Sequence, residues 1–265
     1  MRPNHNVFPR DASARSRFAS KERRASNQVV FITGASKRLG REIALFFANH
    51  GMRTALHYRH SKKEALQLAE QINRARPGTA RAFQADLNDV RQIKKIVAEA
   101  GEYFKKIDIL INNASIYEKN QFGKTTLDDW DRHLNANLRA PFFLAQEVIP
   151  WMKKEGQIIN IADWAGLRPY ADFIPYCVSK AGLLCLNTAL AKALAPRIRV
   201  NAILPGPILL PEKSSPRFKQ AVIEATPLKR IGAPKDIVKA VAFLVESGSF
   251  MTGAQISVDG GRLIA

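Results

Sequence analysis

Short apolar runs alternate with longer stretches of helical periodicity from residue 28 to the end of the chain. Runs rich in β-branched and aromatic residues predict strands at 29–33, 54–58, 80–84, 107–111, 157–161, 199–203 and 255–258. Helical patterns between them cover 37–50, 62–75, 88–104, 127–154, 175–194 and 234–246. Because this repeat builds parallel strand pairs through right-handed crossovers, residues 28–265 are predicted to form one Rossmann-type, doubly wound α/β domain with a seven-stranded parallel sheet and helices on both faces.

A proline-rich segment at 205–227 interrupts the alternation. Its composition predicts a mobile loop with a short helix. Ligands of doubly wound sheets bind beyond the carboxyl ends of the strands, so we expect this segment to cover that cleft.

Residues 1–27 hold seven Lys or Arg residues against Asp11 and Glu22. The segment lacks the apolar core of a secretory signal, and its composition predicts a disordered basic tail. An organellar transit peptide stays open as an alternative, although the two acidic residues argue against it. We therefore expect a cytoplasmic protein.

The formal net charge of the chain is +18, which is compatible with nucleic-acid binding. The basic residues are dispersed, however, and form no compact stripe with interleaved aromatic residues. A solvated basic surface is therefore favoured over nucleic-acid binding as the main function. No apolar run reaches the roughly 18 residues that a membrane helix needs.

The two cysteines, Cys177 and Cys185, lie eight positions apart in a helical pattern. That spacing separates them by about 12 Å, which is too far for a disulfide. We expect reduced packing residues rather than a nucleophile, because only Lys180 offers a basic neighbour to Cys177. No metal site is predicted.

The sequence TGASKRLG at 33–40 follows the first predicted strand and opens the first predicted helix. Gly34 permits a sharp turn and Gly40 permits close packing of helix on strand, so that N–H groups at the helix start face a pyrophosphate. Arg38 is unusual there, since a small residue is usual, and its guanidinium is expected to point to the groove where cofactor and substrate meet. The predicted cofactor residues of this turn are Gly34, Ser36, Lys37, Arg38, Leu39 and Gly40.

Tyr176 and Lys180 lie one helical turn apart, and this pair follows a phosphate-binding turn and the sequence NNAS at 112–115. With PG at 205–206 and VDGG at 258–261, these motifs make residues 28–263 resemble the short-chain dehydrogenase/reductase family. The resemblance implies that Tyr176 is the general acid and that Lys180 holds the nicotinamide ribose. An ammonium beside a phenol also predicts a Tyr176 pKa about 1–3 units below 10.

The family resemblance assigns further residues. Asn137 matches an asparagine that supports a water-linked proton relay to the lysine, a role compatible with a hydrogen bond at a helix kink. Asp86 and Leu87 match an adenine-contacting pair, although Asp86 is alternatively the N-cap of the next helix. The resemblance also implies a homotetramer and adds cofactor contacts at Asn113, Ala114, Ser115, Tyr176, Lys180, Pro205 and Gly206.

Asp163 stands 13 residues before Tyr176, where the family usually has a serine that binds the substrate carbonyl. A carboxylate there would repel a developing alkoxide but would accept hydrogen bonds from a substrate rich in N–H donors. Asp163 together with Arg38 resembles the pteridine reductase branch, in which Tyr117 would sandwich the pterin and Ser115 would touch both ligands. The predicted substrate residues are Arg38, Ser115, Tyr117, Asp163 and Tyr176. The alternative interpretation of Tyr117 is a surface aromatic residue in a loop that does not contact the substrate.

The second predicted strand ends in Tyr58, Arg59, His60 and Ser61. Basic groups there hold a 2′-phosphate, whereas an acid would accept from a ribose hydroxyl, so NADPH is the predicted cofactor. The leading prediction is an NADPH-dependent pteridine reductase that converts a dihydrobiopterin- or dihydromonapterin-type substrate to the tetrahydro form, with catalytic residues Asp163, Tyr176, Lys180 and Asn137. The alternatives are a 3-oxoacyl-carrier or other carbonyl reductase, with Asp163 as a chance replacement, and a non-catalytic dinucleotide-sensing or RNA-binding family member.

Overall fold

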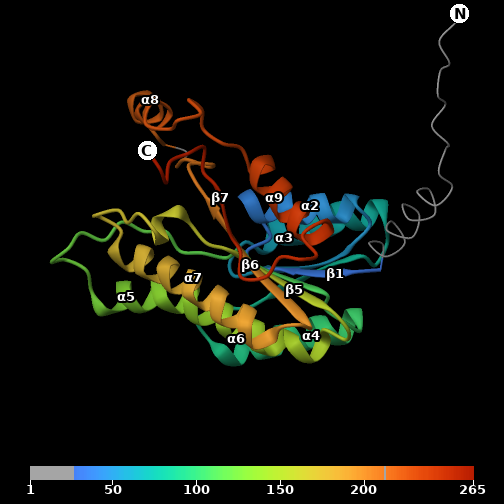
Figure 1. The fold of residues 1–265 in the computed structure, drawn as a ribbon. Coiled ribbons are helices and arrows are strands. Elements are labelled where there is room, and N and C mark those ends of the chain that lie inside the picture. The colour runs from blue at the N-terminus through green and yellow to red at the C-terminus, as the bar shows by residue number, and fades with distance from the viewer. Residues whose placement is uncertain (1–26, 212) are drawn as a thin grey trace, which may run out of the picture.

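A computed structural model describes residues 27–211 and 213–265 (Figure 1), so almost the whole predicted N-terminal tail lies outside the described residues. Seven parallel strands form one sheet in the order β3-β2-β1-β4-β5-β6-β7. Their bounds are β1 Val29–Ile32, β2 Arg53–Tyr58, β3 Ala80–Gln84, β4 Ile109–Asn112, β5 Gly156–Ile161, β6 Ile198–Pro205 and β7 Gln255–Val258. The predicted doubly wound sheet is confirmed.

Helices cover both faces of the sheet (Figure 1). The main ones are α2 Arg38–Asn49, α3 Lys62–Ala75, α4 Val90–Phe104, α5 Leu127–Leu134, α6 Ala140–Val148, α7 Ile174–Leu194, α8 Pro216–Glu224 and α9 Pro234–Glu246. On one face, Phe47 of α2 and Val241 of α9 are fully buried in an apolar cluster with the strands. On the other face, Ile93 of α4 and Leu144 of α6 belong to a second cluster. Burial on both faces explains the continuous apolar sequence of β1.

The single helix predicted over 127–154 is instead four segments, namely α5, a π-helical turn, α6 and a 3-10 turn. Residues Asn135–Arg139 form a π-helical turn between α5 and α6, and Ile149–Trp151 form a 3-10 turn. Pro141 lacks the N–H that would continue the α-helical ladder to the carbonyl of residue 137, which favours the wider turn. The amphipathic pattern continues through such an interruption, so periodicity alone cannot locate it.

Helix α7 is long and apolar enough to cross a membrane by length and composition. In the fold, Leu183 and Leu184 of α7 pack against Ala202 and Leu204 of β6 in a buried cluster. The apolar sequence of α7 is therefore explained by packing within the domain.

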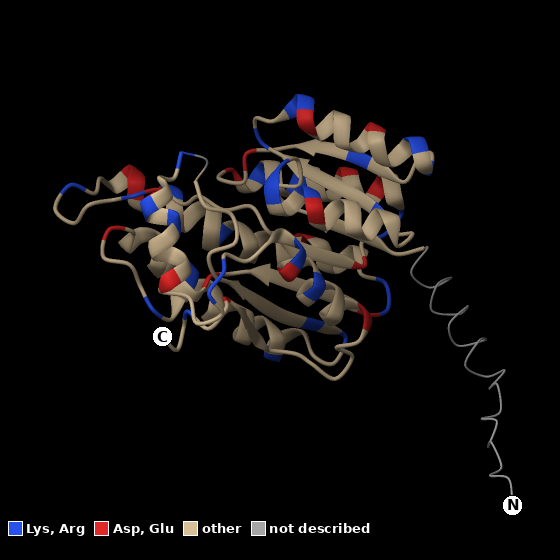
Figure 2. Ribbon diagram, turned by 90° about the horizontal axis from the view of Figure 1, so that it is seen from above, with Lys and Arg blue, Asp and Glu red and all other residues tan. Residues whose placement is uncertain are grey.

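The basic surface has no compact stripe in the view of Figure 2, where acidic positions lie among the basic ones over several helices. Lys37 pairs with Glu64, Arg74 with Glu70 and Arg230 with Asp236 at 2.7–2.9 Å. This interleaving of charges agrees with the interpretation of a solvated surface.

Candidate active site

The turn after β1 depends on glycine at two positions. Gly34 has φ +62°, and a Cβ on Gly40 would lie 2.2 Å from the Gly34 carbonyl oxygen and 2.7 Å from Asn113 Nδ2. Asn113 Nδ2 donates to the carbonyls of Thr33 (2.8 Å) and Gly34 (3.2 Å), which joins the turn to the end of β4. The strand order reverses between β1 and β4, so this turn opens onto the crevice where doubly wound sheets bind ligands.

The N-terminus of α2 is suited to an anion. Its N-cap, Lys37, makes no side-chain capping hydrogen bond, and the first helical turn contains no acidic residue. Arg38 adopts φ +52°, a left-handed conformation that explains why a small residue is usual here. Uncapped N–H groups, the helix dipole and two neighbouring cations fit a pyrophosphate.

Arg38 also joins this turn to the segment after β6. Its Nη2 donates to the Leu209 carbonyl at 2.8 Å, and both residues line a cavity of about 360 Å³. The lining of this cavity includes Glu42, Pro234 and Lys235 but none of Ser115, Tyr117, Asp163 and Tyr176, so the predicted orientation of Arg38 toward the substrate stays a prediction. A guanidinium has five donors and only one is engaged in the bond to Leu209. Helix α8 follows within the 205–227 segment, which confirms its predicted short helix.

His57 is a site residue that sequence reasoning did not single out. It is buried, its Nδ1 accepts from the Gly34 N–H at 3.1 Å, and its Nε2 lies 3.1 Å from the Ala85 carbonyl. The Gly34 contact needs an acceptor, so Nε2 carries the proton and donates to Ala85. Burial lowers the His57 pKa to about 4. A histidine among the buried residues at the end of a strand was the available signal.

The carboxyl end of β2 carries the exposed side chains of Arg59 and His60. Arg59 Nη2 lies 2.7 Å from Asp86 Oδ2, so the carboxylate orients the guanidinium. The alternative reading of Asp86 as an N-cap is wrong: Asp89 caps α4 by accepting from the Arg91 N–H. Leu87, predicted to contact adenine, belongs to the buried apolar core beneath this edge.

Tyr176 meets Asp163 directly. Its hydroxyl donates to Asp163 Oδ2 at 2.8 Å, while Asp163 Oδ1 accepts from the Ala165 N–H at 2.7 Å and caps the 3-10 turn Trp164–Gly166. Burial raises the pKa of Asp163 above the ordinary value, against the opposing effect of these hydrogen bonds. The carboxyl of Asp163, whose pKa is raised, is therefore hydrogen-bonded to the hydroxyl of Tyr176, the predicted general acid.

The expected lowering of the Tyr176 pKa is wrong. Burial, followed by the negative charge of Asp163, raises this pKa well above its ordinary value. Lys180 Nζ lies 5.7 Å from the centroid of the Tyr176 ring and donates to the Ile161 carbonyl at 2.9 Å. Burial lowers the Lys180 pKa to about 8. The sequence spacing placed Tyr176 and Lys180 on one helix face. It could not show that both side chains are buried, which is the largest cause of their pKa shifts.

Asn137 lies inside the π-helical turn and is buried. Its Oδ1 accepts from the Ile116 N–H (2.8 Å) and the Ser115 hydroxyl (3.1 Å), and its Nδ2 donates to the Ile116 carbonyl and to Ser179 Oγ. From the sequence, we expect Asn137 to form a hydrogen bond at a helix kink, in addition to its role in a proton relay. The structure shows such bonds at the π-helical turn. Asn137 also connects the loop after β4 to α7.

Tyr117 lies beside Tyr176. Its ring stacks on Phe173 with centroids 4.5 Å apart and meets the Tyr176 ring edge-on at 4.8 Å. Half of Tyr117 remains exposed, and the exposed Ser115 lies two residues before it. The structure thus brings Tyr117, Asp163 and Tyr176 to one place, and Ser115 is held on the same loop by Asn137.

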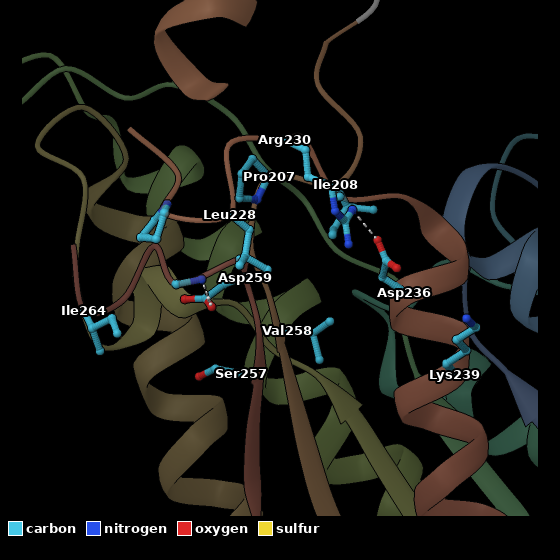
Figure 3. Close-up of a pocket in the computed structure, with 14 residues that line it drawn as sticks. Pro207, Ile208, Leu228, Arg230, Asp236, Lys239, Ser257, Val258, Asp259 and Ile264 are labelled. Carbon is cyan, nitrogen blue, oxygen red and sulfur yellow. Dashed lines mark hydrogen bonds and ion pairs between the residues drawn. The ribbon is translucent and has the colours of Figure 1, made fainter. Parts of the chain in front are cut away.

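Pro205 ends β6 and Gly206 follows it, and both are predicted cofactor contacts. A Cβ on Gly206 would lie 2.5 Å from Asp259 Cα, so glycine is needed for packing at this point. A cavity of about 570 Å³ lies nearby between the end of β7, α9 and the 207–208 segment (Figure 3). Its lining includes Val258, Arg230 and Lys239 but none of the residues around Tyr176, so we do not assign the chemistry to it.

Comparisons with known proteins agree with this geometry. Residues 34–262 match a family model described as enoyl-(acyl carrier protein) reductase. The chain is 33% identical over 247 residues to the 3-oxoacyl-acyl-carrier-protein reductase FabG of Thermotoga maritima, covering 91% of this chain and 100% of that protein. The chain belongs to the short-chain dehydrogenase/reductase family.

Two similar solved structures contain a nicotinamide cofactor. FolM alternative dihydrofolate reductase 1 of Brucella suis, in complex with NADP, has a TM-score of 0.85 and 33% identity over 91% of this chain and 97% of that chain. A blue fluorescent protein from a metagenomic library, in complex with NADPH, has a TM-score of 0.84 and 34% identity over 89% and 97% of the two chains.

Proposed function

We propose that this oxidoreductase is an NADPH-dependent pteridine reductase. The observation that carries the proposal is the hydrogen bond of 2.8 Å between the Tyr176 hydroxyl and the Asp163 carboxyl, at the position where the family resemblance puts a serine. A similar solved structure is described as an alternative dihydrofolate reductase, and a dihydrofolate contains a pterin ring. Its similarity therefore supports a pterin as substrate.

The donor groups of the crevice fit NADPH. The uncapped start of α2 would hold the pyrophosphate, while Arg59, His60 and Ser61 would hold the 2′-phosphate at the end of β2. Lys180 would hold the nicotinamide ribose, as the family resemblance implies. When bound, this cofactor supplies a hydride. The NADP and NADPH complexes of similar proteins support this choice.

The side chains around Tyr176 would deliver the proton. Reduction of a pterin C=N bond places the hydride on carbon and a proton on nitrogen, so each reduced bond consumes one NADPH and one proton. The Tyr176 hydroxyl, or a water that it orients, would supply this proton. Asp163 would accept a pterin N–H and, because burial raises its pKa, could also pass a proton to Tyr176.

The substrate would lie against Tyr117. An aromatic side chain next to Tyr176 offers a flat surface for a bicyclic ring. Arg38 would donate to acceptor atoms of the pterin with the guanidinium hydrogens that Leu209 does not engage. Ser115, held by Asn137, would touch both ligands.

A second candidate function is reduction of a 3-oxoacyl carrier. Its support is the 33% identity to FabG of Thermotoga maritima. In this case Asp163 would be a chance replacement of the serine, and a negative charge would face the developing alkoxide. A non-catalytic, dinucleotide-sensing or RNA-binding role is the weakest candidate.

We further propose a homotetramer in the cytoplasm. Tyr103, Leu127 and Phe142 expose apolar surface on α4, α5 and α6, which lie on one side of the sheet (Figure 1). Such side chains favour association of subunits through this face.

Comparison of substrates tests the proposed function. NADPH oxidation by the purified protein is measured with dihydrobiopterin and dihydromonapterin, and with an acetoacetyl thioester and a simple ketone at equal concentration. We expect saturable turnover of the pterins and at least tenfold lower rates with the carbonyl compounds, because only the pterins offer N–H donors to Asp163. Turnover of the thioester or ketone alone would favour the second candidate.

A further inference from the structure

The segment between β4 and α5 carries Tyr117 with little support from regular structure. Apart from one bridge between Asn120 and Phe173, residues 113–126 form neither helix nor strand. Tyr117 is 52% exposed, so core packing does not fix its ring. Asn137 holds the backbone of Ile116, the residue before Tyr117. A defined position of Tyr117 beside Tyr176 also needs an anchor on the other side of Tyr117.

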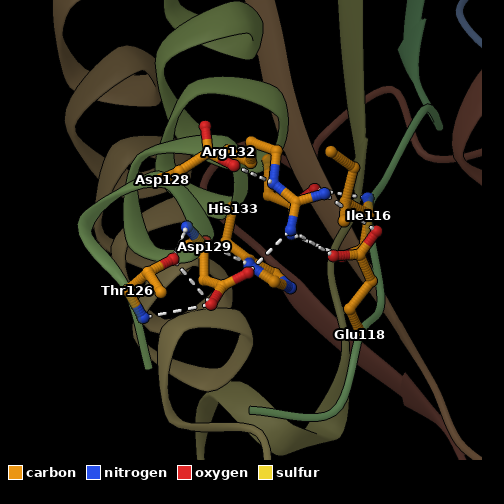
Figure 4. Close-up of polar contacts among 8 residues, drawn as sticks. Ile116, Glu118, Thr126, Asp128, Asp129, Arg132 and His133 are labelled. Atoms are coloured by element: carbon orange, nitrogen blue, oxygen red, sulfur yellow. Dashed lines mark hydrogen bonds and ion pairs between the residues drawn. The ribbon is translucent and has the colours of Figure 1, made fainter. Parts of the chain in front are cut away.

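Arg132 of α5 holds the residue that follows Tyr117 (Figure 4). Its Nη2 lies 3.0 Å from Glu118 Oε2 and 2.7 Å from Asp129 Oδ1, and its Nε lies 3.0 Å from Asp128 Oδ2. One guanidinium therefore joins three carboxylates, two on its own helix and one on the loop. A planar fork with several donors suits this arrangement better than a single ammonium.

The helix end of this network is fixed by hydrogen bonds at the start of α5. Asp129 forms a capping box with Thr126: its Oδ2 accepts from the Thr126 N–H at 3.0 Å and from the Thr126 hydroxyl at 2.8 Å. These bonds, together with Arg132, lower the Asp129 pKa to about 2, so the carboxylate stays charged at neutral pH. Arg132 is thus anchored to the start of α5 and holds Glu118 from a fixed point.

A second set of contacts holds the other side of the loop. Lys119 pairs with Asp172 at 2.8 Å, and the Asn120 N–H donates to the Asp172 carbonyl at 2.8 Å. Asp172 precedes Phe173, on which Tyr117 stacks. Tyr117 is therefore bracketed by a partner for its ring and by an anchor for the next residue along the chain.

We propose that Arg132 is a positioning residue that acts through Glu118 to hold Tyr117 at the substrate site. Within the described residues, the ion pairs of Arg132 are with Glu118, Asp128 and Asp129 and not with Tyr117 or Tyr176. Its effect on catalysis passes through the loop, so it changes substrate binding rather than hydride transfer. The inference rests on the proposed function in one respect, namely that Tyr117 contacts the substrate.

A double-mutant cycle between Arg132 and Tyr117 tests this proposal. We expect Arg132→Gln to raise KM for dihydrobiopterin about fivefold, the effect of a favourable partly exposed ion-pair network, with kcat and the Kd of NADPH changed less than twofold. Arg132→Lys should restore part of the loss. In a Tyr117→Ala background, Arg132→Gln should have no further effect on KM.

Two further variants provide a second test and a control. Glu118→Gln leaves Arg132 with its partners on α5 and should reproduce the rise in KM even if Arg132→Gln folds poorly. Arg74→Gln, which breaks an exposed pair with Glu70 on α3, is the matched control and should leave KM unchanged. An unchanged KM in Arg132→Gln and Glu118→Gln, or an equal rise with and without Tyr117, would overturn the proposal.

Failure of the positioning role can be distinguished from failure of the proposed function. If the wild-type protein reduces a carbonyl compound and no pterin, the proposed function fails, and the cycle is measured with the compound that is reduced. Coupling between Arg132 and Tyr117 in that assay would still support the positioning role. Its absence would overturn it.

Discussion

Tyr176→Phe is expected to lower kcat by about a thousandfold, because the variant lacks the hydroxyl proton beside the substrate. The remaining ring keeps its edge-on contact with Tyr117, so the shape of the site should be retained. The Kd of NADPH should change by less than about threefold, since the phosphate-binding turn and Arg59 are untouched. Stopped-flow single turnovers with dihydrobiopterin would separate this loss from slow product release.

Loss of the Tyr176 hydroxyl also leaves Asp163 Oδ2 without its partner, which costs about 1–3 kcal/mol of stability. Thermal unfolding must therefore show that the variant is folded at the assay temperature. Tyr103→Phe is a suitable control because Tyr103 lies on α4 and a phenylalanine ring preserves its contact with Arg81, whose guanidinium lies 4.5 Å from the ring centroid. A Tyr176→Phe enzyme with more than a tenth of wild-type turnover would contradict the assignment.

Acidification from pH 6.5 to pH 4 is expected to destabilise the protein through His57. Its folded pKa is about 4 against 6.5 for a free histidine. In this window the unfolded chain binds a proton that the folded protein excludes, so the stabilising contribution is complete above pH 6.5 and is lost as the pH falls. Over 2.5 pKa units the loss reaches about 3 kcal/mol.

Denaturant unfolding at several pH values would measure this effect. Other groups titrate in the same window, so the informative quantity is the difference between the wild-type protein and His57→Gln. The free energy of unfolding of the variant should depend less on pH than that of the wild-type protein. Equal slopes in the wild-type protein and in His57→Gln would show that His57 binds its proton equally well in the folded and unfolded states, which would contradict this prediction.

The sequence pattern was sufficient for the architecture because the strands are buried on both faces. All four residues of β1 and five of the six in β2 are buried, which produces the short apolar runs from which the sheet was predicted. The pattern was insufficient where a single proline changes the hydrogen-bond ladder, as at Pro141. It also placed the start of α4 two residues early, since the capping side chain is Asp89.

The candidate site was predictable where spacing determines contact. Tyr176 and Asp163 were selected from separate segments, and the fold brings them to 2.8 Å. The direction of the Tyr176 pKa was not predictable, because it depends on burial by residues remote in sequence. The same limit applies to His57, whose partners Gly34 and Ala85 follow other strands.

The central claim is that Asp163 selects a substrate with N–H donors, and Asp163→Ser tests it most directly. Serine can also cap the turn at Trp164, so the fold should be retained. The measurement is kcat/KM of both proteins for dihydrobiopterin and for the ketone. We predict a loss of about ten- to a hundredfold for the pterin and none for the ketone. Intact pterin reduction together with faster ketone reduction would contradict the account.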